Sequence, residues 1–166
     1  MPMLVHIAPE KDVAAIRRAG IRFSKNRAGV YAMPVIKNFM FSHQWVRELK
    51  RGRGTLCAVY FRIPDGETVL MGHYNKEHVQ LAAAQAAHAI MHAPDPLGMQ
   101  VIIPRGIAPR EIHAIRSVPQ VVGWRYFPGA HARRPCGCPA CQPRGGIKTR
   151  KVREAFEREL RDDTDP

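Results

Sequence analysis

The closest spacing of metal-ligating residues in this sequence lies near its C-terminus. Three cysteines fall within six positions of a loop rich in Gly and Pro: Cys136, Cys138 and Cys141. Thiolates bind zinc tetrahedrally, and close spacing lets one loop supply several ligands. We expect His131 to be the fourth ligand, with Cys57 and His113 as alternatives. A structural zinc would hold a segment that buries too little to fold by itself. Three free thiols in a tail are the other interpretation.

A histidine and a tyrosine near the N-terminus form a second candidate site. The apolar run at 4–7 predicts a short buried strand that carries His6. The pattern over 9–19 predicts a helix, with a proline in its first turn and a glycine after its end. A basic loop follows, and 29–32 reads as a second strand that carries Tyr31. An imidazole and an aromatic ring on neighbouring strands could together form a cradle for a nucleotide.

This order of elements resembles the start of the ADP-ribosyltransferase-like superfamily, which includes diphtheria-toxin-like enzymes, DarT-type toxins and RNA 2′-phosphotransferases. The resemblance covers roughly residues 3–32 and 98–116, where 107–112 is similar to a closing "proline, then Glu-Ile" segment. It implies that NAD is bound, with His6 on the adenosine-side ribose and Tyr31 stacked on nicotinamide. Arg22, Lys25 and Arg27 in the intervening loop would grip the pyrophosphate.

The resemblance also implies a glutamate on a late strand, which would hold the reacting ribose hydroxyl. Here Gln100 stands where that glutamate is expected. Glutamine can hydrogen-bond a hydroxyl but cannot act as a base. Glu111 is the nearest carboxylate and Glu67 is another option. The RNA 2′-phosphotransferases work without that glutamate and use basic residues instead.

The charge of the chain favours a polyanionic partner. Lys and Arg number 26 against 14 Asp and Glu, which gives a formal net charge of +12. Such a surface attracts phosphates, so we expect nucleic-acid contact. The expected contact residues surround the cysteines: Arg133, Arg134, Arg144, Lys148 and Arg150. Trp124, Tyr126 and Phe127 precede them and could stack on unpaired bases. A solvated charged face over a packed aromatic core is the alternative.

The elements that must position these residues predict an α+β fold with a small split β-sheet core and three to four helices. Besides the segments above, Ser42 is the expected N-cap of a helix over about 41–51, and a second, Ala-rich helix is expected over 77–92. Further strands are predicted at 55–62, 67–71, 99–103, 111–116 and 121–127. A short charged helix is expected over about 149–160.

Composition limits the class of protein. The chain has 45% apolar residues but no apolar run long enough to cross a membrane, and it shows no secretory signal. Clustered cysteines argue against a disulfide framework and for a reducing cytoplasm. We expect an ADP-ribosyltransferase-like domain at 1–127, a zinc-knuckle and helix at 128–161, and a disordered tail at 162–166.

Two main hypotheses for the function follow. The first is an NAD-dependent transferase that moves ADP-ribose, or accepts a 2′-phosphate onto NAD, with nucleic acid as the acceptor. The second is a non-catalytic, zinc-stabilised protein that binds DNA or RNA. A protein that binds an acidic protein partner is a third.

Overall fold

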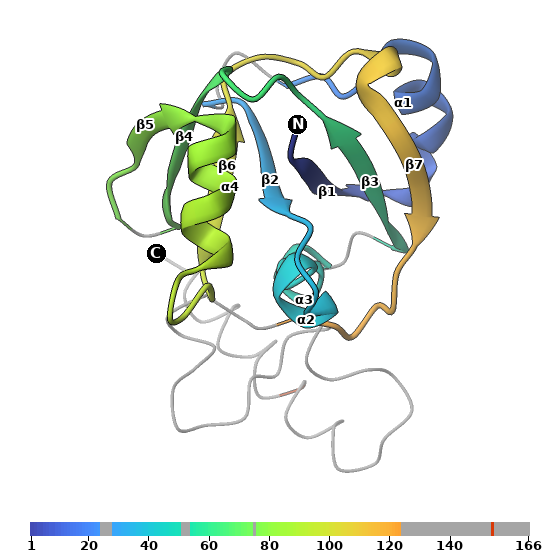
Figure 1. Cartoon of the computed structure of the whole chain (residues 1–166). Coiled ribbons are helices and arrows are strands. Elements are labelled where there is room, and N and C mark those ends of the chain that lie inside the picture. The colour runs from blue at the N-terminus through green and yellow to red at the C-terminus, as the bar shows by residue number, and fades with distance from the viewer. Residues whose placement is uncertain (24–27, 51–53, 75, 124–153, 155–166) are drawn as a thin grey trace, which may run out of the picture.

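A computed structural model describes residues 1–23, 28–50, 54–74, 76–123 and 154 of the chain. These residues form an α+β fold on one seven-stranded sheet in which all neighbouring strands are antiparallel (Figure 1). The strands are β1 (Met3–Pro9), β2 (Val30–Pro34), β3 (Leu56–Arg62), β4 (Thr68–His73), β5 (Val79–Ala82), β6 (Met99–Ile103) and β7 (Ile112–Ser117). The helices are α1 (Val13–Ala19), α2 (Phe39–Ser42), α3 (Val46–Leu49) and α4 (Ala83–Met91), with 3-10 turns η1 (Glu10–Asp12) and η2 (Pro109–Glu111).

The sheet opens between β1 and β2, in the middle of the strand order β5-β4-β6-β2-β1-β3-β7. β1 pairs with β3 along its whole length, but with β2 only through Leu4 opposite Pro34 and Val5 opposite Met33. On its other edge, β2 pairs with β6 from Val30 to Ala32. β1 and β2 diverge beyond their short contact, as Figure 1 shows. The residues that follow Val5 on β1 and precede Met33 on β2 therefore flank an opening in the sheet.

The helices cover the sheet with apolar faces. α4 contacts β2, β4, β5 and β6, and it buries Ala83, Ala86, Ala87 and Ile90. α1 buries Ile16 and ends at Gly20, whose φ of 78° suits glycine. A Cβ at Gly20 would lie 2.0 Å from the carbonyl oxygen of Ile107, so glycine lets the chain pass close to the segment that leads into β7. No helix within the described residues is long and apolar enough to cross a bilayer.

The expected helix over 77–92 is wrong in its first part, which forms β5. Residues 79–82 pair with β4, and the helix begins only at Ala83. The backbone N–H groups of Ala83 and Ala84 donate to the carbonyl oxygens of Glu67 and Asp65, at 2.8 and 3.0 Å. Local composition favours helix throughout this segment. Pairing with β4 gives the backbone groups of residues 79–82 hydrogen-bond partners, whereas the first N–H groups of a helix beginning there would bond only to water. This pairing decides where the strand ends and the helix begins.

The expected helix over 41–51 is also wrong in its start and its continuity. It forms two single turns, α2 and α3, and the N-cap is Asn38, whose Oδ1 accepts from the N–H of Met40 at 3.0 Å. Ser42 instead ends α2, and its hydroxyl is bonded to the backbone of Ile36. Residues 121–123 are not in a strand, and the rest of the expected strand at 121–127 lies outside the described residues. The other strand predictions are confirmed with small shifts in their ends.

Candidate functional site

A cavity of about 720 Å³ lies where β1 and β2 separate. Its size is within the range of small-molecule sites. Its walls come from β1, the segment after α1, β2 and the two short helices with the residue between them, and from single residues of η1, β3, β6 and the turn after β4. The residues are Val5, His6, Ile7, Pro9, Asp12, Ile21, Arg22, Phe23, Gly29, Val30, Tyr31, Ala32, Met33, Ser42, Trp45, Glu48, Leu49, Leu56, Tyr74 and Gln100. Three of the expected site residues, His6, Tyr31 and Gln100, thus line one cavity from three strands.

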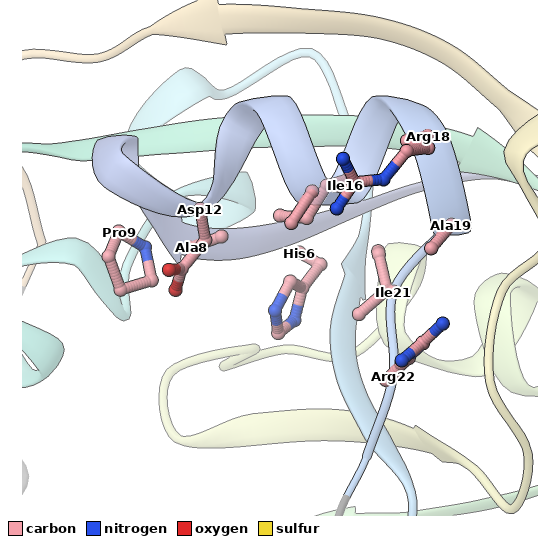
Figure 2. Close-up of a pocket in the computed structure, with 11 residues that line it drawn as sticks. His6, Ala8, Pro9, Asp12, Ile16, Arg18, Ala19, Ile21 and Arg22 are labelled. Carbon is pink, nitrogen blue, oxygen red and sulfur yellow. The ribbon is translucent and has the colours of Figure 1, made fainter.

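His6 is fixed against β2 by a hydrogen bond. Its Nδ1 lies 2.7 Å from the carbonyl oxygen of Tyr31. Because a carbonyl oxygen can only accept, Nδ1 must carry the proton, and in the neutral ring Nε2 is then an acceptor. Figure 2 shows the ring pointing into a smaller hollow of about 300 Å³ between α1 and the segment that carries Ile21 and Arg22. This hollow adjoins the larger cavity, since both are lined by His6, Pro9, Asp12, Ile21 and Arg22.

Aromatic side chains contribute much of the larger cavity. Tyr31 is 37% exposed, so a ligand can reach its ring without displacing the core. Trp45 and Tyr74 meet edge to face with ring centres 5.8 Å apart, and the Trp45 indole donates to the carbonyl oxygen of Met99 at 3.2 Å. Trp45, which lies between α2 and α3, packs against the hydrophobic core and also lines the cavity.

Gln100 is only 9% exposed and lies in the wall of the cavity on β6. Its amide nitrogen is 3.0 Å from Nε2 of His78, which precedes β5. Sequence reasoning gave His78 no role. The signal that could have found it is weak: a histidine in the segment after Gly72 and before the next strand.

The carboxylates considered as replacements for the missing glutamate lie elsewhere. Glu67 and Glu111 both bind the guanidinium of Arg105, each through two oxygens at 2.6 to 2.8 Å. Glu111 also accepts from the N–H of Ala108 at 2.8 Å, and Arg105 holds the pKa of the Glu111 carboxyl below its usual range. Neither glutamate lines the cavity. The carboxylates that line it, among the described residues, are Asp12 and Glu48.

The remaining expected site residues fall outside or at the edge of what the structure describes. Arg22 is exposed and lines both hollows. Arg27, the four expected zinc ligands His131, Cys136, Cys138 and Cys141, and the five expected nucleic-acid contacts Arg133, Arg134, Arg144, Lys148 and Arg150 lie outside the described residues, as does the boundary expected after residue 127.

The alternative zinc ligands have different surroundings. Cys57 is buried in β3, where burial raises the pKa of its thiol, whereas His113 is exposed on β7. No group of three or more His, Cys, Asp or Glu side chains within the described part of the chain could hold a metal ion. The zinc interpretation therefore stays a prediction that rests on the C-terminal cysteines.

Models of protein families, curated proteins and solved structures were all compared with the chain, and none of them matches it. The kind of ligand that the cavity could bind is therefore inferred from the residues that line it. The cavity combines exposed aromatic surface, a histidine of fixed tautomer, a buried amide and an arginine at its edge. Such a set suits a ligand with a flat ring, hydroxyl groups and a phosphate.

Proposed function

We propose that this protein is an NAD-dependent transferase, moving ADP-ribose or accepting a 2′-phosphate onto NAD, with nucleic acid as the acceptor. The single observation that carries the proposal is the convergence of His6, Tyr31 and Gln100 on one cavity at the opening of the sheet. They come from positions 6, 31 and 100, so no local pattern in the sequence requires them to meet. An ADP-ribosyltransferase-like split sheet is part of the same proposal.

The cavity residues fit the parts of NAD. The Tyr31 ring, exposed on β2, offers a stacking surface for nicotinamide. Nε2 of His6 can accept from a ribose hydroxyl, because the bond to Tyr31 fixes the proton on Nδ1. Arg22 lines both the main cavity and the adjoining hollow, so its cation could meet the pyrophosphate between them. NAD itself supplies the reactive glycosidic bond to nicotinamide.

Catalysis at this cavity would depend on positioning and electrostatics. Cleavage of the nicotinamide bond builds positive charge on the ribose, so the site must hold the ribose rigidly as that charge develops. Gln100 is neutral and cannot take a proton from an acceptor group. Glu67 and Glu111 are held by Arg105. An acceptor that is already ionised, such as a phosphate, would need no general base, which favours phosphate-bearing nucleic acid.

The net charge of +12 supports a polyanionic acceptor. It supports the non-catalytic alternative equally, in which the chain binds DNA or RNA through its basic residues. The two functions separate in their response to NAD. A binder should show salt-dependent affinity for RNA that NAD leaves unchanged.

A thermal-shift experiment tests the proposal. Saturating NAD or ADP-ribose should raise the melting temperature of the wild-type protein, because a ligand that binds only the folded state stabilises it. His6→Ala and Tyr31→Ala should reduce the shift, whereas Tyr31→Phe, which keeps the aromatic face, should retain most of it. His88→Ala on the exposed face of α4 is the matched control. An unchanged wild-type melting temperature in saturating NAD would overturn the proposed function.

A further inference from the structure

Gln100 has an unusual environment for a buried amide. Its side chain is 9% exposed and lines the cavity. Within the part of the chain that the structure describes, its side chain makes one hydrogen bond, between the amide nitrogen and Nε2 of His78 at 3.0 Å. Buried polar groups are nearly always paired, so an amide oxygen left over in a cavity wall points to a ligand.

The backbone of β4 provides a seat for His78. Gly72 lies opposite Gln100 in the pairing of β4 with β6. A Cβ at Gly72 would lie 3.1 Å from both Cα and Cγ of His78, and 2.9 Å from the carbonyl oxygen of Glu77. The absence of a side chain at Gly72 therefore lets His78 pack over the strand and reach Gln100.

The bond between these two side chains fixes which end of the amide is available. The amide NH2 can only donate, so Nε2 of His78 must accept. The ring proton of the His78 imidazole must therefore lie on Nδ1. His78 holds one of the two N–H groups of the amide, and the oxygen Oε1, which makes no hydrogen bond within the described residues, is the acceptor that can serve a ligand. A hydroxyl group is the natural partner, since it can donate to that oxygen.

We propose that His78 is a positioning residue that holds the Gln100 amide so that Oε1 accepts a hydrogen bond from a ligand hydroxyl in the cavity. The inference rests on the proposed function, in which that hydroxyl belongs to a ribose. Gln100 then recognises the ribose without taking its proton. His78 acts through Gln100 and does not itself line the cavity.

Calorimetric titration with ADP-ribose tests the role of both residues. His78→Ala and Gln100→Leu should each weaken binding about fivefold to tenfold, which is the usual effect of one hydrogen bond. The double variant should bind no more weakly than Gln100→Leu alone, because both changes remove the same interaction. His88→Ala should bind as the wild type does. Unchanged affinity in folded His78→Ala protein would overturn the inference.

The tautomer of His78 gives a second readout that needs no ligand and no variant. Long-range proton–nitrogen NMR spectra of the wild-type protein should show His78 protonated at Nδ1. Protonation at Nε2 instead would mean that the amide is turned and presents its NH2 group to the cavity, which would overturn the inference. If the wild type does not bind ADP-ribose, the proposed function is overturned. The NMR spectra would still decide the orientation of the Gln100 amide.

Discussion

Nδ1 of His6 donates a 2.7 Å hydrogen bond to the carbonyl oxygen of Tyr31, and so joins β1 to β2 where their ladder has ended. The bond replaces the backbone pairing that these strands lose at the opening. It also ties the orientation of the imidazole to the strand that carries the exposed tyrosine. A ligand between the diverging strands would therefore meet both residues in a fixed relation.

Glu111→Gln should lower the free energy of unfolding at pH 7 by about 1 kcal/mol. The carboxylate accepts two hydrogen bonds from Arg105 and one from Ala108, and partial exposure of Arg105 reduces the effect. The folded pKa of Glu111 is below its usual value of 4.5, mainly through Arg105. The stabilisation is therefore complete above pH 4.5 and is lost as the pH falls through the lowered pKa.

Urea denaturation of the wild type and Glu111→Gln at pH 7 and pH 3 measures this difference. The difference in stability between the two proteins should be smaller at pH 3 than at pH 7. Glu10→Gln, which removes an exposed carboxylate, is the control and should change stability little at either pH. Equal stability of Glu111→Gln and wild type at pH 7 would show that the contacts of the Glu111 carboxylate with Arg105 and Ala108 do not stabilise the fold.

Mild acid should destabilise the fold through His43. The side chain is 2% exposed; its Nδ1 donates to the carbonyl oxygen of Phe39 at 3.0 Å, and its Nε2 accepts from the Tyr60 hydroxyl at 2.8 Å. Burial lowers the pKa of His43 below 6.5. The unfolded chain then binds the proton more readily, so the free energy of unfolding decreases as the pH falls from 6.5 toward the lowered pKa.

Comparison of unfolding curves between pH 8 and pH 5 for wild type and His43→Gln measures this contribution. The variant should be less stable at pH 8 but should depend less steeply on pH. Tyr60→Phe should cost about 1 kcal/mol at pH 8, because it leaves an imidazole nitrogen without its donor. An identical pH dependence in the wild type and His43→Gln would rule out the role of this residue.

The purified protein should contain about one equivalent of zinc, a prediction that rests on the spacing of Cys136, Cys138 and Cys141. Elemental analysis measures the zinc directly. Cys138→Ser should lose most of it, whereas Cys57→Ser should retain it if His131 is the fourth ligand. Less than half an equivalent in wild-type protein purified without chelator would contradict the zinc-knuckle.

The sequence by itself determined most of the strands of this protein. Alternating or continuous apolar runs at 55–62 and 99–103 allow few other conformations, and β3 and β6 formed there. It also indicated His6 and Tyr31 as candidate residues, whereas Gln100 was a candidate only through the resemblance to the ADP-ribosyltransferase-like superfamily. The pattern of apolar residues along one strand predicts the position of that strand, because it depends only on residues that are near in the chain.

Only the tertiary structure decided which of these residues meet. The opening lies where β2 stops pairing with β1 while its other edge stays paired with β6, a long-range arrangement that no local propensity encodes. Gln100 on β6 lines the cavity, whereas Glu111 and Glu67 bind Arg105 and do not line it. Strand β5 likewise arose against a helical composition, since pairing with β4 outweighed the local preference.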